Sequence, residues 1–163
     1  FIMSWKKYLG FPEPRDNNFK FSNRSKNNLQ GVHEDLILVA ARALELTEVD
    51  FGVTEGLRSR MRQRELVNEG KSQTMNSRHL TGHAIDVVPY VGGKVSWNWD
   101  HFYPVADAFI KAADELDIPL RWGGNWRVHD VRAWESTARE LNRAYTGSFH
   151  DGPHFELPKR YYP

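Results

Sequence analysis

The sequence contains no cysteine. This absence excludes disulfide bonds, thiolate metal ligands and cysteine nucleophiles together. Any metal site in the protein must therefore be built from histidine, aspartate and glutamate side chains. The absence leaves the redox compartment undecided.

A long apolar run is also missing. The longest apolar-looking stretch, Leu36 to Leu46, contains Arg42 and Glu45 and is too short to span a bilayer, so we expect no membrane insertion. The first residues, Phe1 to Lys7, lack the charged start, continuous apolar centre and cleavage site of a secretory signal. We therefore expect a protein made in the cytoplasm without a signal peptide.

The sequence has no large excess of charge of either sign: it contains 22 basic and 21 acidic residues, which give a net charge of +1. This balance argues against a dedicated nucleic-acid-binding protein. The charge is uneven, however. Gly56 to Leu80 contains six basic and two acidic residues, namely Arg58, Arg60, Arg62, Arg64, Lys71 and Arg78 against Glu65 and Glu69. This patch suits an acidic partner, although a solvated helix face explains most of it equally well.

The length of 163 residues is that of one domain. Residues 1–18 are rich in the glycine, proline, asparagine and aspartate that form turns, so we predict an irregular N-terminal extension there. Residues 19–163 are predicted to form a single domain. We expect the protein to be a monomer.

One stretch, Ser77 to Asp86, combines metal-capable side chains with a glycine and an aspartate that enters an apolar run. Asp86 lies between Ile85 and Val87, in a pattern typical of a buried strand. A carboxylate there is costly unless a positive or hydrogen-bonding group meets it. A divalent metal shared with His79 would meet this requirement.

A second stretch, His150 to Leu157, supplies a further histidine. Polar and apolar residues alternate in His154-Phe155-Glu156-Leu157, which predicts a half-buried strand with His154 on its polar face. Asp151 lies in the Gly-Pro turn before this strand. Two histidines and one carboxylate are a common ligand set for catalytic zinc, and a spare acidic residue beside the third ligand is a natural general base.

These motifs resemble those of a known family, the zinc D-alanyl-D-alanine carboxypeptidases and L-alanyl-D-glutamate peptidases, whose fold is shared with the Hedgehog signalling domain. The family pattern Ser-x-His-x-x-Gly-x-Ala-x-Asp is matched from Ser77 to Asp86, and an acidic residue three before a histidine is matched from Asp151 to His154. Gly56-Leu57-Arg58 is a third match, and the similarity runs from about Phe19 to Leu157. The segment Leu120 to Trp126 is most similar to phage lysis enzymes of the L-alanyl-D-glutamate branch.

The resemblance implies an α+β fold in which helices pack against a small antiparallel sheet. It also implies a set of zinc ligands, which are His79, Asp86 and His154. Asp151 would then be the general base, and Arg58 would hold the scissile carbonyl as it becomes an oxyanion. Ser77 would bind a substrate carboxylate. From spacing alone, Arg58 reads as a surface arginine and Ser77 as a plain loop serine.

Two positions depart from the family pattern. Asn125 stands where an acidic residue is more usual, and His83 occupies a variable position from which it could compete as a ligand. The spacing of His101, His129 and His150 is not typical of metal ligands.

The resemblance implies a zinc-dependent peptidase of the phage endolysin type that cleaves the L-alanyl-D-glutamate bond of bacterial peptidoglycan stem peptides. Such an enzyme would reach the wall through a separate pore. A D-alanyl-D-alanine carboxypeptidase could use the same zinc site, and a catalytically inactive zinc-bearing module that binds wall peptides is a further alternative. A nucleic-acid-binding protein would need a larger basic surface interleaved with aromatic residues.

Hydrophobic periodicity predicts the remaining elements. Helices are expected over residues 32–46, 59–70 and 105–116, and a helix or a helical loop over 133–144. Strands are expected over 50–54, 85–88, 118–122 and 154–157. Gly92-Gly93 suits a hairpin turn at positive φ. Trp97 and Trp99, which follow the hairpin, could pack on the core or line a cleft, and we expect core packing.

Overall fold

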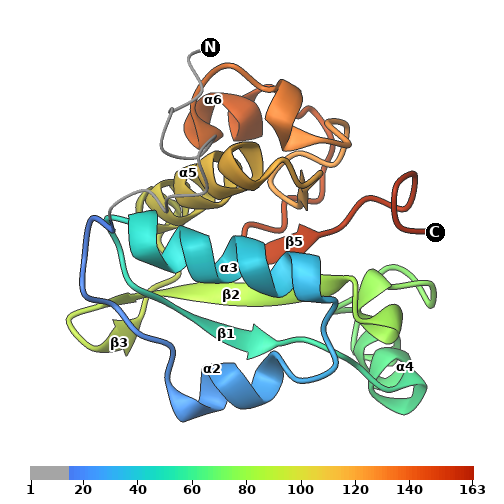
Figure 1. The fold of residues 1–163 in the computed structure, drawn as a ribbon. Coiled ribbons are helices and arrows are strands. Elements are labelled where there is room, and N and C mark those ends of the chain that lie inside the picture. Colours follow the sequence, from blue (N-terminus) through green and yellow to red (C-terminus); the bar gives the residue numbers. More distant parts are fainter. Residues whose placement is uncertain (1–14) are drawn as a thin grey trace.

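A five-stranded sheet lies at the centre of the computed structural model, which describes residues 15–163 (Figure 1). Four strands follow the spatial order β1-β2-β5-β4, and β3 pairs with β2. The strands are β1 (Phe51–Glu55), β2 (Ala84–Val91), β3 (Lys94–Val95), β4 (Arg121–Trp122) and β5 (His154–Glu156). Every pairing is antiparallel, which confirms the predicted α+β class.

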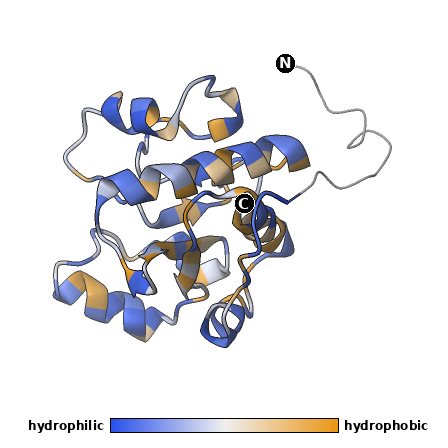
Figure 2. Ribbon diagram, turned by 90° about the vertical axis from the view of Figure 1, so that its left-hand side faces the viewer, coloured by the Kyte–Doolittle hydropathy of each residue, from blue (hydrophilic) through white to orange (hydrophobic). Residues whose placement is uncertain are grey.

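Helices surround this sheet. The α-helices are α2 (Asn23–Asn28), α3 (Glu34–Leu46), α4 (Arg60–Asn68), α5 (Trp99–Leu116) and α6 (Ala138–Arg143), and two short 3-10 helices are η1 (Arg78–Thr81) and η2 (Val131–Ala133). Helix α3 lies along the β1–β2 pair and packs against α5, while α2 packs against β1 (Figure 1). Hydrophobic and hydrophilic stretches alternate along the helices, as Figure 2 shows by colour, and the hydrophobic residues of α3 and α5 belong to one buried cluster.

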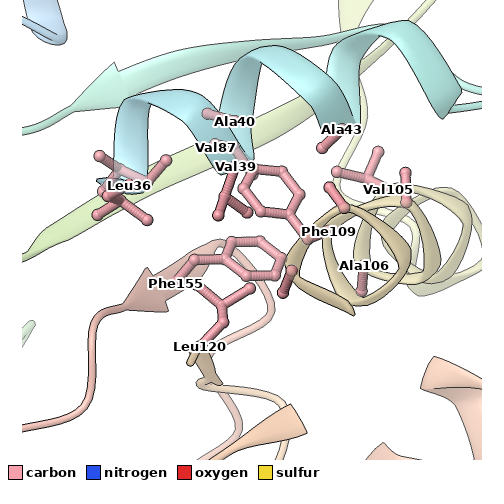
Figure 3. Packing of buried hydrophobic residues seen from close by; sticks show 14 of the residues in the cluster. Leu36, Val39, Ala40, Ala43, Val87, Val105, Ala106, Phe109, Leu120 and Phe155 are labelled. Atoms are coloured by element: carbon pink, nitrogen blue, oxygen red, sulfur yellow. The ribbon is translucent and has the colours of Figure 1, made fainter. Parts of the chain in front are cut away.

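The core forms where α3 and α5 meet the sheet. Apolar residues of α3 recur at helical spacing and are buried there, namely Leu36, Val39, Ala40 and Ala43. Phe109 of α5 stacks on Phe155 of β5 with ring centroids 3.9 Å apart, below α3 in Figure 3. Because Phe155 is adjacent to His154 in β5, this stack fixes the strand that delivers the predicted third ligand.

The helix ends follow capping rules. Helix α3 begins at Glu34 because the His33 side chain accepts a hydrogen bond from the backbone N–H of Asp35, and it ends where Thr47 becomes extended. Ser59 caps α4 as the sequence predicts. The predicted hairpin after β2 is confirmed, with φ of 60° at Gly92 and 76° at Gly93.

Several parts of the chain differ from expectation. Helix α5 starts at Trp99 rather than at residue 105, and the strand expected over 118–122 is confined to β4. Over residues 133–144, where a helix or a helical loop was expected, α6 starts only at Ala138 because Thr137 caps it. Helix α2 has no counterpart in the prediction. It starts after Ser22, whose side chain accepts a hydrogen bond from the backbone N–H of Ser25.

Of the predicted extension over residues 1–18, residues 1–14 lie outside the described part of the chain. Residues 15–18 are irregular, and Asn17 ties them to the end of α3 by donating to the carbonyl oxygens of Leu44 (2.9 Å) and Thr47 (2.7 Å). The division of the chain at residue 18 stays a prediction. No helix between residues 15 and 163 has both the length and the apolar character needed to cross a membrane.

The core packing yields a first prediction. Phe109→Ala should lower the free energy of unfolding by about 3–5 kcal/mol, because it opens a cavity beside Phe155 in a fully buried site. Leu38→Ala is the control: this residue of α3 is 52% exposed, so its replacement should change stability by less than about 0.5 kcal/mol. Chemical denaturation measures both values. Equal stabilities for the two variants would contradict the described core.

Candidate metal centre and active-site cleft

The register of the sheet places two predicted ligands opposite each other. Asp86 of the central strand β2 pairs with His154 of β5 on one side and with Glu55 of β1 on the other. Directly opposed residues of antiparallel strands have Cβ atoms about 4.5–5.5 Å apart, so their side chains meet without any loop rearrangement. Strand β5 was predicted to be half-buried, but all three of its residues are buried because it lies between β2 and β4.

The third predicted ligand, His79, comes from η1. The side chain of Ser77 caps this short helix by accepting a hydrogen bond from the His79 backbone N–H (3.2 Å). Gly82 ends it at φ 76°, and a Cβ atom there would lie 2.4 Å from the carbonyl oxygen of Gly31. Only glycine meets both constraints. The turn thereby holds His79 in the interior, where it is 2% exposed.

Hydrogen bonds decide which ring nitrogen of each histidine faces Asp86. His79 Nδ1 bonds the carbonyl oxygen of Gly56 (2.8 Å), which makes Nδ1 the donor and leaves the lone pair of Nε2 3.3 Å from Asp86 Oδ1. His154 Nε2 bonds Glu156 Oε1 (2.9 Å), and its Nδ1 lies 3.4 Å from Asp86 Oδ1. In their neutral forms both histidines thus present an acceptor nitrogen to one point.

This arrangement fits a metal ion. One ligand atom from each of His79, Asp86 and His154 lies within 4.8 Å of the other two. A tetrahedral ion with bonds of about 2.0–2.2 Å separates its ligand atoms by roughly 3.3–3.6 Å, which agrees with the two nitrogen-to-oxygen distances to Asp86. Two neutral imidazoles and one carboxylate leave a fourth position open.

Positive charge stabilises the buried carboxylates of this cluster. Burial alone would raise the pKa of Asp86, but His79 and His154 outweigh it and hold that pKa well below its usual value. Burial alone would lower the pKa of His154, yet its hydrogen bonds to Asp86 and Glu156 raise it to about 10. A cation and the proton on His154 therefore satisfy the same carboxylates and compete for the site.

Asp151 lies beside this cluster without belonging to it. Its backbone is fixed by hydrogen bonds from its N–H to the Gly123 carbonyl (2.8 Å) and from the His154 N–H to its own carbonyl (3.2 Å). A Cβ atom on Gly123 would lie 2.4 Å from the Asp151 carbonyl oxygen, so a glycine is needed for this close approach. Burial raises the pKa of Asp151, and the neighbouring His154 only partly opposes the shift.

Arg58 is buried rather than on the surface, where its spacing alone would place it. Its guanidinium holds both carboxylate oxygens of Glu55 at 2.7 and 2.6 Å and donates to Gln63 Oε1 at 2.6 Å. Nη2 also lies 3.5 Å from Asp86 Oδ2. These partners fix the arginine beside Asp86, the carboxylate of the candidate metal site.

Glu156 also belongs to this cluster, although the sequence analysis assigned it no contact with His154. Its carboxylate orients His154, and Arg121 Nη1 on the neighbouring strand lies 3.9 Å from it. A carboxylate behind a metal-binding histidine fixes its tautomer and raises its basicity. The signal was present in the sequence, because residues two apart in a strand share a face.

A cleft of about 770 Å³ opens above the cluster. Basic side chains line it, including Arg58, Lys71, Arg78, Arg121 and Lys159. Aromatic side chains form another part of the lining, namely Trp97, Trp126, Tyr145 and Phe149.

The two tryptophans after the hairpin differ in their packing. Trp99 packs against the core, as expected. The expectation of core packing is wrong for Trp97, because its side chain is 69% exposed and lines the cleft.

The competing histidine, His83, lies apart from the cluster. Its Nδ1 bonds the Thr81 hydroxyl (2.7 Å), and its ring lies against those of His33 and Tyr162.

The departure from the family pattern at Asn125 has a structural reason. Its amide donates to the Leu141 carbonyl (2.7 Å), which an ionised acidic side chain could not do.

Comparisons with known proteins agree with this geometry. A family model described as phage L-alanyl-D-glutamate peptidase matches residues 17–158. The chain belongs to the phage L-alanyl-D-glutamate peptidase family. Membership confirms the resemblance read from the motifs, and it places the chain among hydrolases of the peptidase class.

Individual members of this peptidase family extend the comparison. The L-alanyl-D-glutamate peptidase of Escherichia phage T5 is 37% identical over 147 residues, which cover 85% of this chain and 98% of the T5 protein. The enzyme of the same name from Listeria phage A118 is 30% identical over 109 residues, covering 65% of this chain and 38% of that protein. The crystal structure of the Serratia marcescens L-Ala D-Glu endopeptidase ChiX superposes with a TM-score of 0.72 at 46% identity, covering 89% of this chain and 94% of that one.

The metal centre yields a second prediction. His79→Ala and His154→Ala should each reduce bound metal from about one ion per chain to a small fraction, because a site with two protein ligands holds its ion weakly. His83→Ala should retain the metal, since that ring lies with His33 and Tyr162. Elemental analysis after dialysis measures the metal content. Loss of metal from His83→Ala with retention in His79→Ala would contradict the ligand assignment.

Proposed function

We propose that this protein hydrolyses the L-alanyl-D-glutamate bond of bacterial cell-wall stem peptides, with a zinc ion held by His79, Asp86 and His154. The main support is the site itself: three convergent ligand atoms and Asp151, a half-buried carboxylate outside the ligand set, line one cleft. The names of the related phage enzymes and of ChiX supply the bond.

Zinc suits the donor set best. Two imidazoles and one carboxylate with an open fourth position are the usual ligands of catalytic zinc, whereas calcium and magnesium prefer all-oxygen sites. When bound, the ion supplies Lewis-acid chemistry, which activates water at neutral pH and polarises a carbonyl group. The protein's own contribution is to orient both histidines, through the Gly56 carbonyl and Glu156.

Asp151 is the proposed general base. Its raised pKa makes its carboxylate a stronger proton acceptor than an ordinary aspartate, and its position beside His154 puts it within reach of the attacking water. It takes a proton from that water and later passes the proton to the leaving amine. The aspartate remains free for this role because Asp86 is the carboxylate in the ligand set.

Arg58 and Ser77 have supporting roles in this proposal. Arg58 presents a fixed positive charge to negative charge that develops on the scissile carbonyl oxygen, and its ion pair with Glu55 prevents it from turning away. Ser77 lines the cleft, where its hydroxyl can donate to a substrate carboxylate while its oxygen caps η1. Both roles are compatible with the hydrogen bonds that these side chains already make.

The lining of the cleft supports a stem-peptide substrate. Stem peptides carry free carboxylates, and the basic residues along the cleft complement that charge. Solvated basic residues of α4, such as Arg62 with its exposed ion pair to Glu65, contribute little to the site. Delivery through a separate pore and a monomeric state stay predictions from the sequence.

A third prediction tests the base. Asp151→Asn should lower the turnover number by about 10²- to 10⁴-fold, because the amide keeps the shape of the side chain but cannot accept the proton. Zinc content and thermal midpoint should stay near those of the wild type. Hydrolysis of purified peptidoglycan, elemental analysis and thermal unfolding are measured on one preparation.

The matched control is Asp117→Asn, which makes the same change in a side chain that is 87% exposed and outside the cleft lining. It should leave turnover unchanged. If zinc is lost together with activity in Asp151→Asn, Asp151 is a ligand instead. If activity survives with zinc intact, the base lies elsewhere, and Glu156 is the next carboxylate to test.

A fourth prediction concerns the bond. Mass spectrometry of digested peptidoglycan should show stem peptides with a new N-terminal D-glutamate and glycan strands that retain L-alanine. Removal of the metal with EDTA should abolish these products, and added zinc should restore them. Free D-alanine as the main product would contradict the proposal and favour a carboxypeptidase, while binding of wall peptides without any product would favour an inactive binding module.

A further inference from the structure

Gln63 is a polar side chain of α4 that is completely buried, with an exposure of 0%. It does not line the cleft, so it has no direct contact with a peptide bound there. Its three hydrogen-bond partners, however, all line the cleft, and they are Arg58, Ser72 and Thr74. Any effect of Gln63 on the reaction must therefore pass through these partners.

The partners fix the orientation of the Gln63 amide. Arg58 Nη1 can only donate, so the amide oxygen faces it, at 2.6 Å. The amide nitrogen then donates to Ser72 Oγ (2.9 Å) and to the Thr74 carbonyl oxygen (2.5 Å), which can only accept. The reverse orientation would place donor against donor and acceptor against acceptor. One amide thus joins the guanidinium to the backbone of a loop.

This loop, residues 71–77, connects α4 to η1 and forms one wall of the cleft; we call it the wall loop. Its start is tied to α4, because the backbone N–H groups of Lys71 and Ser72 donate to the Leu66 carbonyl oxygen. Its end is the cap of η1, at Ser77. Between these two ends, the contacts from Gln63 hold the loop to the body of the protein.

A neutral acceptor suits the position beside Arg58. The guanidinium already faces two carboxylates, those of Glu55 at 2.6 and 2.7 Å and of Asp86 at 3.5 Å. A third carboxylate would further offset the positive charge that the proposed function assigns to Arg58. The amide of Gln63 holds Nη1 in place without adding negative charge.

We infer that Gln63 is a positioning residue that holds Arg58 and the wall loop in one fixed arrangement around the bound stem peptide. This inference rests on the proposed function. Arg58 acts on charge that develops during the reaction, so its displacement lowers kcat. The wall loop borders the peptide before and during the reaction, so its release raises KM.

Two substitutions test the inference. Gln63→Met keeps the length of the side chain and removes all three hydrogen bonds, and Gln63→Glu keeps the shape but adds the negative charge. With a synthetic stem peptide containing the L-alanyl-D-glutamate bond, kcat should fall roughly tenfold in both variants, as expected for a hydrogen bond to a charged group, and KM should rise about threefold. Gln30→Met makes the same change at an exposed site outside the cleft lining and should keep wild-type kinetics.

A double-mutant cycle separates positioning from a general loss of structure. In an Arg58→Ala background, Gln63→Met should change kcat by less than about twofold, because the group through which it acts is gone. The rise in KM should persist, because it depends on the wall loop. Effects of independent residues multiply, so a further tenfold fall in kcat in this background would overturn the inference.

NMR provides a readout that needs neither turnover nor the Arg58→Ala variant. In the wild type the two protons on Arg58 Nη1 should give separate signals, because the bond to Gln63 restricts rotation of this group. In Gln63→Met these signals should merge, and the backbone amides of residues 72–76 should exchange faster with solvent. Identical spectra and exchange rates in the two proteins would contradict the positioning role.

Two failures are distinguishable. If the wild type cleaves the peptide and both Gln63 variants keep kcat and KM within about twofold of its values, the role of Gln63 is overturned and the proposed function stands. Absence of cleavage by the zinc-loaded wild type would overturn the proposed function. The NMR comparison would then still decide whether Gln63 holds Arg58 and the wall loop.

Discussion

A carboxylate in the middle of the central strand is the constraint on which this structure depends. Asp86 lies in β2 between apolar residues that belong to the core, and its charge needs compensation from every neighbouring element. Strand β5 brings His154, η1 brings His79, and the turn after β1 brings Arg58. The sheet register and the capped turn therefore serve one electrostatic requirement, and a metal ion bound there would meet it with the charge that a proton would otherwise supply.

The two aspartates near the site have opposite environments, and this difference separates their roles. His79 and His154 hold the pKa of Asp86 low in spite of its burial, so Asp86 stays ionised and is suited to bind a metal. Asp151 is desolvated with weaker compensation, which raises its pKa and makes it the better proton acceptor. Titratable groups whose pKa values are pushed apart in this way commonly divide the work of ligand and acid or base in enzymes.

Much of the site was predictable because its residues obey local rules. A charged residue in a β-branched run marked Asp86, and alternation marked His154, while helical periodicity located α3, α4 and α5. The burial of Arg58 was not predictable from spacing, because it depends on ion pairs within a folded turn. The exposure of Trp97 was not predictable either, because tertiary contacts decide which side chains are buried. The late start of α6 was missed because the cap at Thr137 decides where this helix begins.

The most direct test of the metal centre is a crystal structure of the zinc-loaded protein with anomalous scattering recorded at the zinc edge. The account predicts one strong anomalous peak bound by His79 Nε2, a carboxylate oxygen of Asp86 and His154 Nδ1, with Asp151 close by but outside the coordination sphere. A peak between His33 and His83, or one coordinated by Asp151 in place of Asp86, would contradict it.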